Sequence, residues 1–173
     1  MTVIVSKHRL FAWVDTSILP DHRLFAFARD DDYFLGVLHS RIHERWSLTM
    51  GSTLEDRPSY SSLTCFETFP FPWPPGTEPV DDPCVQAIAA AAKDLVEKRD
   101  RWLNPKGATE AELKKRTLTN LYNQRPTWLD LAHGRLNEAA FDAYNWPHDL
   151  SDDKILERLL ALNLDRAAKQ EAQ

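Results

Sequence analysis

Glycine and cysteine are scarce in this chain, which has five glycines and two cysteines among 173 residues. The glycines form no phosphate- or cofactor-loop pattern, which argues against a bound nucleotide cofactor. Cys65 and Cys84 lack metal-type spacing, so we expect reduced thiols. The sequence has no apolar run near the roughly 20 residues that span a membrane. Its N-terminus has no basic-then-apolar signal layout. We therefore expect a cytoplasmic protein without a membrane partner.

Positive charge is also in short supply, because the formal net charge is −5. Residues 1–79 hold seven Lys/Arg against ten Asp/Glu, and residues 80–173 hold fourteen against sixteen. Neither half could bind nucleic acid through an overall positive potential. A local basic face would still suffice for a recognition module, and much of the phosphate affinity would then come from another domain.

Metal-dependent chemistry has little support in the residue pattern. Asp21 follows Pro20, but no downstream Glu-x-Lys completes a nuclease carboxylate set. His39 and His43 are spaced to share one face of a helix and could hold zinc, yet no third ligand converges on them and the HExxH pattern is absent. We expect instead that these histidines lie on a solvated or DNA-facing helix surface, and we predict no catalytic, metal or cofactor-binding residue.

The expected fold class is α+β. Residues 2–14 and 23–29 are rich in β-branched and aromatic residues and predict two strands, and apolar spacings of three and four predict a helix over residues 33–50. Capping signals and helical spacing predict helices over 83–103, 109–122, 127–144 and 151–168. Six prolines between residues 70 and 83 indicate a boundary. We therefore expect a compact unit at residues 1–75, a Pro-rich linker at 76–83 and a helical domain at 84–173.

Alternating aromatics and prolines distinguish the segment CFETFPFPWPP, residues 65–75. Each proline lacks a backbone donor and restricts the residue before it to extended geometry. The segment is therefore expected to be a rigid extended strap rather than a helix. Phe66, Phe69 and Phe71 should bury their rings against the first helix or the sheet.

The polar segment 53–64 is the main functional candidate. Arginine can donate two hydrogen bonds to guanine, carboxylates can accept from cytosine, and hydroxyls can donate to phosphate. Arg41 and Arg45, one turn apart on the predicted helix 33–50, are candidates for phosphate contacts. The alternative is a solvated hairpin tip without a ligand. The predicted DNA-binding side chains are those of Glu55, Asp56, Arg57, Ser59, Tyr60, Ser61, Ser62, Arg41 and Arg45.

The order of helix, polar segment and aromatic–Pro strap resembles the end of the target-recognition region in bacterial DNA methyltransferases of the type IIG/IIL, MmeI-like class. The phrases YNQRPTWL and AYNWPHDLSDDKILERLLALNLDR resemble the helical C-terminal domain that follows it. In that family a phrase of the form RYS–FETFPFP closes the domain that recognises DNA. Here Arg57–Ser61 has the sequence RPSYS, which leaves the register open by a residue or two.

The resemblance implies double-stranded DNA as a partner and a catalytic domain outside this chain, in cis or in trans, that holds S-adenosylmethionine. Adenine methylation needs an Asn-Pro-Pro-aromatic loop, whereas Asn104-Pro105 continues as Lys-Gly, so we expect no methyl transfer by the chain alone. A truncated gene, a fragment and a separate subunit all remain open. The main alternative function is a protein-interaction module that docks on a methyltransferase or another subunit of a defence system.

Overall fold

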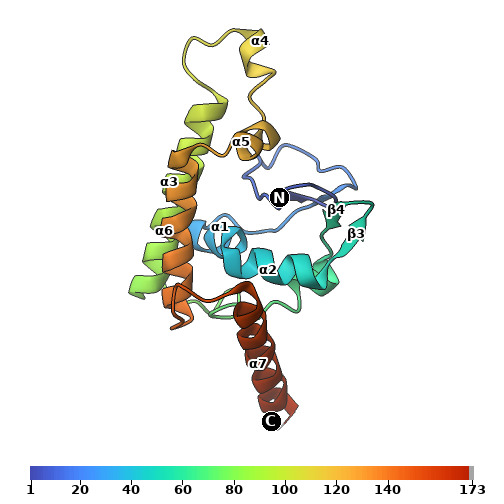
Figure 1. The fold of residues 1–173 in the computed structure, drawn as a ribbon, viewed down its shortest axis with the longest axis vertical. Helices are drawn as coiled ribbons and strands as arrows, with labels where there is room; N and C mark the ends of the chain where they lie inside the picture. Colours follow the sequence, from blue (N-terminus) through green and yellow to red (C-terminus); the bar gives the residue numbers. More distant parts are fainter. Residues whose placement is uncertain (172–173) are drawn as a thin grey trace.

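Short strands and paired helices occupy the first part of the chain, and long helices occupy the rest (Figure 1). The computed structural model describes residues 1–171. It confirms the α+β class. The elements in chain order are β1 (Thr2–Val3), β2 (Leu24–Phe25), α1 (Asp32–His39), α2 (Arg41–Met50), β3 (Ser52–Leu54), β4 (Arg57–Ser59), the π-helical turn η1 (Ser62–Phe66), α3 (Pro83–Leu103), α4 (Glu110–Leu113), α5 (Leu118–Gln124), α6 (Thr127–Ala143) and α7 (Asp152–Glu171).

The strands are much shorter than the β-rich segments predicted. β1 and β2 pair antiparallel over two residues each, with Thr2 opposite Phe25. After β1 the chain folds back beside its own start, because the Thr2 hydroxyl donates to the Leu10 carbonyl at 2.7 Å and the Ala12 amide donates to the Met1 carbonyl at 3.0 Å. An isolated bridge between Val5 and Ser59 joins this segment to the β3–β4 hairpin.

The single helix expected over residues 33–50 is two helices, α1 and α2, divided at Ser40. Ser40 has extended backbone angles, φ −69° and ψ 152°, and ends α1 while it begins α2. Its hydroxyl donates to the Val37 carbonyl at 2.7 Å and accepts from the His43 amide at 3.4 Å. A serine hydroxyl can replace backbone partners in this way, so one residue satisfies both helix ends. At the other end of α1, Asp31 caps the helix by accepting from the Phe34 amide at 2.7 Å.

The aromatic–Pro strap packs against α1 and α2, as predicted. Phe69 and Phe71 are buried and Phe66 is partly buried against the same core. The Phe69 ring lies 4.8 Å from the His43 ring. The expectation of extended geometry was wrong at the start of the segment, where Cys65 and Phe66 belong to η1. A proline restricts only the residue before it, so Pro70 leaves this turn free to form.

Side chains from the C-terminal helices hold the backbone of the strap. The Tyr144 hydroxyl donates to the Pro70 carbonyl at 2.9 Å. The Asn163 amide donates to the Thr68 carbonyl at 2.9 Å. Arg166 donates to the Phe71 carbonyl at 2.8 Å and to the Pro72 carbonyl at 3.1 Å. The strap has too many prolines to form the backbone hydrogen bonds of a β-sheet. Its carbonyls instead accept hydrogen bonds from side chains that lie far away in the sequence.

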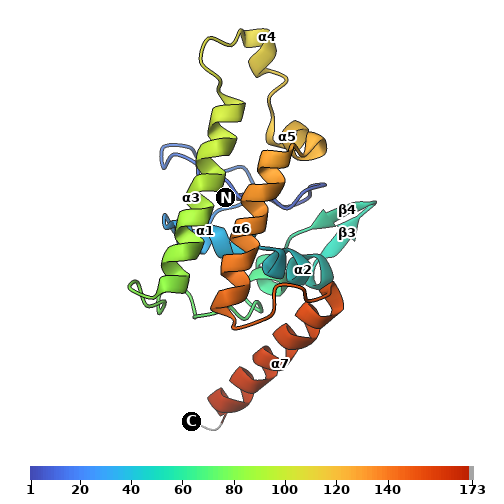
Figure 2. The same cartoon turned by 60° about the vertical axis from the view of Figure 1, so that its left-hand side comes forward.

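One continuous core joins the two parts of the chain. α1 packs against α3, and α3 packs along α6 (Figures 1 and 2). The contact between α1 and α3 is close at Gly36, where an added Cβ would lie 2.6 Å from Cγ2 of Ile88. The buried residues form one cluster that runs from Phe11 to Leu159. The parts before and after the Pro-rich segment therefore share a core, in contrast to the two compact units that we expected.

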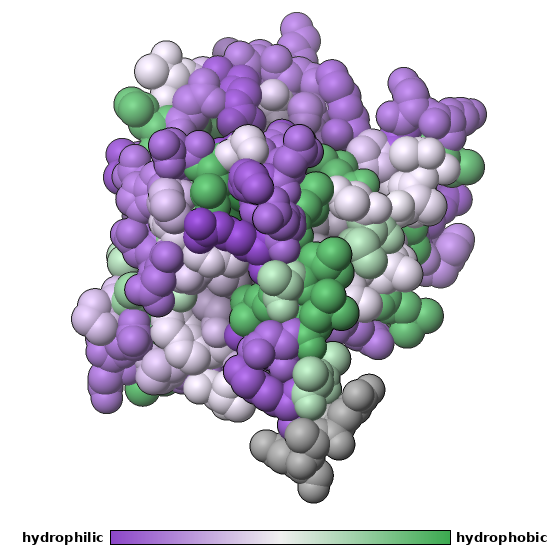
Figure 3. Space-filling model, turned by 60° about the horizontal axis from the view of Figure 1, so that its bottom comes forward, coloured by the Kyte–Doolittle hydropathy of each residue, from purple (hydrophilic) through white to green (hydrophobic). Residues whose placement is uncertain are grey.

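The predicted helices of the C-terminal part have mixed outcomes. α3 and α6 match their predicted ranges closely, whereas the helix expected over 109–122 is divided into α4 and α5. The capping box between Thr109 and Glu112 is present. α7 buries Ile155 and Leu159 and leaves Leu160 exposed. Hydrophobic surface is visible beside the C-terminal end of α7 in Figure 3.

Two further expectations concern cysteines and membranes. Cys65 is buried and Cys84 is half-buried, and both thiols are free. Within residues 1–171 no helix is both long enough and apolar enough to cross a membrane.

Candidate nucleic-acid interface

The polar segment forms a tight β-hairpin, β3–β4, that projects from the body of the molecule (Figure 2). Its register pairs Ser52 with Ser59 and Leu54 with Arg57, so Glu55 and Asp56 form a two-residue tip. Glu55 has a φ of 58°. A two-residue connection of this kind often needs a residue with positive φ, and here a glutamate takes that position in place of glycine or asparagine.

The tip presents charged groups to solvent. Glu55, Asp56 and Arg57 are all exposed. Arg57 donates to Oε2 of Glu55 at 2.8 Å, and their side chains are 48% and 74% exposed, respectively. An exposed pair of this kind contributes little to stability. Separating the Arg57 guanidinium from the Glu55 carboxylate would therefore cost little, and each group could then contact the edge of a base.

Tyr60 requires a correction to the predicted DNA-binding set. Its side chain is 2% exposed, and its hydroxyl lies 3.1 Å from Nε2 of His43. The guanidinium of Arg9 lies over its ring at 4.9 Å from the centroid. Successive side chains of an extended segment point to opposite sides, and here the Tyr60 side chain points inward while its neighbours point outward. It therefore supports the base of the hairpin from the core.

The serines at the base of the hairpin are half-buried and have local roles. Ser59 lies opposite Val5 in the isolated bridge. Ser61 caps η1, where its hydroxyl accepts from the Thr64 amide at 3.4 Å. Ser62 begins η1. The DNA contacts predicted for these three serines stay predictions.

Arg41 and Arg45 share one carboxylate, that of Asp152 at the start of α7. Arg41 donates to Oδ1 of Asp152 at 2.6 Å, and Nε of Arg45 lies 2.9 Å from Oδ2. Both side chains are about one-third exposed. The pair therefore joins α2 to α7 and carries two positive charges against one negative charge. Sequence analysis did not single out Asp152.

His39 and His43 do not lie on a solvated surface, contrary to our expectation. Both are buried, and no group of three or more metal-ligating side chains occurs within residues 1–171. Arg99, itself 3% exposed, donates to Nε2 of His39 at 3.1 Å and to the Phe11 carbonyl at 3.0 Å. The two histidines are polar members of the core.

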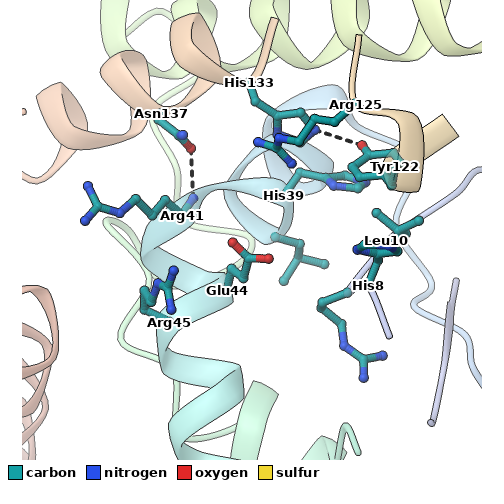
Figure 4. Close-up of a pocket in the computed structure, with 12 residues that line it drawn as sticks. His8, Leu10, His39, Arg41, Glu44, Arg45, Tyr122, Arg125, His133 and Asn137 are labelled. Carbon is teal, nitrogen blue, oxygen red and sulfur yellow. Dashed lines mark hydrogen bonds between the residues drawn. The ribbon is translucent and has the colours of Figure 1, made fainter. Parts of the chain in front are cut away.

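A polar cavity of about 210 Å³ lies between the N-terminal segment, the α1–α2 junction, the end of α5 and α6 (Figure 4). The Tyr122 hydroxyl and Nε2 of His133 lie 2.8 Å apart on one wall. On another wall the Asn137 side chain accepts from the Arg41 amide at 2.8 Å. The lining residues are His8, Arg9, Leu10, Leu38, His39, Arg41, Glu44, Arg45, Tyr122, Arg125, His133 and Asn137.

Three histidines of this region, His39, His43 and His133, are held neutral. Burial, reinforced by the nearby charge of Arg125, lowers the pKa of His133 to about 4. Burial lowers the pKa of His43 to about 3. The pKa of His39 falls well below its usual value, because the ring is buried and Arg99 lies beside it. Positive charge at the cavity therefore belongs to arginines.

Sequence analysis missed the contributions of Arg125, His133 and Asn137 to this cavity. These residues lie more than 60 positions beyond the hairpin, and no spacing rule connects them with Arg41 or Arg45. Arg125 belongs to the phrase YNQRPTWL, which resembles part of the helical C-terminal domain of the MmeI-like class.

Three comparisons with known proteins agree with this fold. Residues 4–73 match the family model "MmeI, target recognition domain". The chain is 30% identical over 132 residues to "DNA methyltransferase A" of Bacillus subtilis (strain 168), which covers 75% of this chain and 13% of the relative. A solved structure described as the type IIL restriction–modification enzyme MmeI in complex with DNA matches with a TM-score of 0.61 and 22% identity. That match covers 80% of this chain and 17% of the MmeI chain.

The matched range has a clear structural meaning. It begins in the segment that bridges to β4, contains the β3–β4 hairpin, and ends in the aromatic–Pro strap. The solved structure supports the same fold beyond the strap, over most of this chain. The chain spans only about one-eighth of the curated relative. Over residues 4–73 this chain is thus similar to the target recognition domain of MmeI, and its fold resembles that of the solved MmeI structure over most of its length.

Proposed function

We propose that this chain recognises and orients double-stranded DNA for an MmeI-like restriction–modification methyltransferase. The observation that carries the proposal is the β3–β4 hairpin, which lies inside the matched target recognition domain and exposes Glu55, Asp56 and Arg57 at its tip. Charged side chains on a narrow ribbon can enter the major groove and contact base edges. The matched relatives are a DNA methyltransferase and an enzyme solved with DNA.

Arg57 is the residue we propose as the main base contact. A guanidinium can donate two hydrogen bonds to O6 and N7 of guanine. Glu55, its partner in the free protein, could accept from the amino group of a neighbouring cytosine. The 2.8 Å ion pair between them would hold both groups at the tip until DNA replaces it.

Arg41 and Arg45 are proposed as contacts to the phosphate backbone. Asp152 neutralises about half of their combined charge, so each would add less to DNA affinity than an unpaired arginine. Contacts of this kind position the duplex without reading its sequence.

The catalytic step belongs, in this proposal, to a domain outside the described residues, in cis or in trans. That domain would hold S-adenosylmethionine and flip the target adenine while this chain holds the duplex. Because the substrate is DNA, the proposed place of action is the cytoplasm.

A second candidate is a module that docks on another protein. The net charge of −5 and the neutralisation of Arg41 and Arg45 favour it over a DNA contact. A gel-shift titration across salt concentrations separates the two functions. Phosphate contacts predict a steep fall in affinity with rising salt, and a docking module predicts no binding to the duplex at any salt.

A further inference from the structure

The polar cavity concentrates positive charge in a molecule whose net charge is negative. Among its lining residues in the described chain, four are arginines and Glu44 is the single carboxylate. The lining comes from four separate segments, two of them beyond residues 4–73. Asp152 pairs with Arg41 and Arg45, and Asp130 pairs with Arg125, so the arginines exceed the nearby carboxylates by one charge. A local excess of positive charge inside a concave and partly enclosed site attracts anions.

Two of the arginines at or behind the cavity are buried without a carboxylate. Arg9 lines the cavity, and its guanidinium donates to the carbonyls of Ile4 and Pro58 at 3.2 and 3.3 Å. Arg99 lies behind it and contacts the lining residue His39. Within residues 1–171 neither forms an ion pair. Buried charges without counter-ions are costly, so an anion entering the cavity would gain from both.

Arg125 has an unusual backbone conformation that turns its side chain toward the cavity. It ends α5 with φ 43° and ψ 63°, in the left-handed region. Pro126 disfavours right-handed helical angles for the residue before it, and glycine or asparagine would take the left-handed ones at lower cost. Nε of Arg125 donates to Asp130 at 2.6 Å. That bond fixes the guanidinium near His133, where Figure 4 shows it at the rim.

We propose that this cavity is a binding site for one phosphate group, with Arg125 at its rim and Arg9 and Arg45 in its walls. The proposal rests on the proposed function in one respect, since a phosphate of the DNA backbone is the expected source. A free phosphate group is the other source with the same chemistry. Neutral His133 and the ring of His8 could add N–H donors, and phosphate oxygens accept such bonds readily.

Glu44 sets the affinity of the site. Its carboxylate points into the cavity (Figure 4), and it forms no ion pair with any residue of the described chain. It opposes an incoming anion by like-charge repulsion. Removal of the Glu44 charge should therefore tighten phosphate binding, whereas removal of the Arg125 charge should weaken it.

The test uses the full chain and inorganic phosphate as the probe, at low ionic strength. Binding is followed by NMR through the Nε–H resonances of the arginines, which give a dissociation constant and identify the contacting groups. Nε of Arg45 is a useful reporter because Arg45 lines the cavity and phosphate would compete there with the Asp152 carboxylate, whose Oδ2 lies 2.9 Å away. The expected result is a saturable shift of the Arg45 and Arg125 resonances.

Three variants make the test specific. Arg125→Asn removes the guanidinium and keeps a residue that tolerates the left-handed conformation, so it should weaken phosphate binding roughly ten- to hundredfold without lowering the melting temperature. Glu44→Gln should tighten binding several-fold. Lys114→Gln removes an equal positive charge from an exposed side chain directly after α4 that does not line the cavity, and it should leave binding unchanged.

A duplex arm distinguishes the two sources of phosphate. If the ligand is a DNA phosphate, Arg125→Asn lowers affinity for every duplex alike and reduces the salt slope by about one. If the site binds phosphate but the duplex affinity does not change, a free phosphate group is the ligand and the site still stands.

The site is overturned if wild-type protein shows no saturable shift, or if Arg125→Asn, Glu44→Gln and Lys114→Gln behave alike. Neither result bears on the proposed base contact of the hairpin, which is tested independently through Arg57. Failure of the phosphate site and failure of DNA recognition are thus separate outcomes.

Discussion

The ring of Phe71 stacks on the ring of Phe34, with 5.8 Å between centroids and an angle of 6° between planes. Phe34 belongs to α1 and Phe71 to the aromatic–Pro strap. The strap is therefore fixed to the same helix that packs on α3. Tyr144, directly after α6, and two side chains of α7 donate to the strap carbonyls, so the strap also connects α1 with the C-terminal helices.

Replacement of Phe69 by Ala should destabilise the protein by about 3–5 kcal/mol, because it removes a buried ring that contacts His43 and Phe71. For a domain of this size the melting temperature should fall by roughly 6–20 °C. Leu19→Ala is the control, since Leu19 is 92% exposed. Thermal unfolding followed by circular dichroism checks both. Equal melting curves for the two variants would show that the strap is peripheral.

Gly36 on α1 and Gly134 on α6 allow a matched comparison of a crowded and an open helix position. A Cβ at Gly36 would meet Cγ2 of Ile88 at 2.6 Å, and nothing lies within 4 Å of one at Gly134. Gly36→Ala should cost about 1–3 kcal/mol through overpacking. Gly134→Ala should stabilise α6 by about 0.5–1 kcal/mol. Chemical denaturation measures both, and a stabilising Gly36→Ala would contradict the close approach of α1 and α3.

The buried histidines predict a loss of stability in mild acid. The folded-state pKa of His133 is about 4 and that of His43 about 3, both below the unfolded value of about 6.5. Their stabilising contribution is complete above pH 6.5 and decreases as pH falls toward the folded-state values. Each should cost about 1.4 kcal/mol per pH unit.

Unfolding free energies measured between pH 6.5 and pH 5.0 test this dependence in a range where most carboxylates stay ionised. His133→Gln keeps a polar partner for Tyr122. It should reduce the slope of the unfolding free energy against pH by the contribution of one histidine. An unchanged slope in this variant would mean that His133 is protonated in the folded protein.

Arg57→Ala in the complete enzyme, catalytic domain included, should cost about 1–3 kcal/mol at one base position and relax the sequence choice there. Arg41→Ala and Arg45→Ala should weaken binding to all sequences alike and flatten the salt slope. Sequencing of methylated sites, together with binding titrations, separates the two patterns. An unaltered motif in Arg57→Ala would assign base contact to another part of the enzyme.

Purified chain should transfer no methyl group from labelled S-adenosylmethionine to DNA. The physical reason is that its sequence has neither an Asn-Pro-Pro-aromatic loop nor a glycine-rich cofactor loop. Scintillation counting of recovered DNA is the measurement. Incorporation above that of a heat-treated sample would contradict the assignment.

Local signals predicted much of the fold, because helix caps and proline positions act over a few residues. α3 begins at Pro83, where the capping signals predicted a helix to start. Thr109 and Glu112 form the capping box that begins α4. The division of a predicted helix at Ser40 could not be foreseen, since serine is tolerated within helices. It depends on packing of α1 and α2 in different directions on one core.

The candidate site was predicted in part. The exposed, charged tip follows from the polarity of segment 53–64, and the base contact of Arg57 stays a prediction. Burial of Tyr60 and His43 was not predicted, because the two groups satisfy each other across 17 positions. The cavity depends on contacts between segments far apart in sequence, such as Arg41 with Asn137, and no local pattern encodes these.

The close contact between Gly36 and Ile88 has a consequence for protein engineering. A recognition segment exchanged between relatives at the Pro-rich boundary would carry α1 but leave α3 behind, and the two faces would no longer match. Chimeras joined at residues 76–83 should therefore fold poorly unless the α3 residues that face Gly36 are transplanted with it. Changes of specificity are better made at the tip of the hairpin, where Glu55, Asp56 and Arg57 can vary without disturbing any core contact.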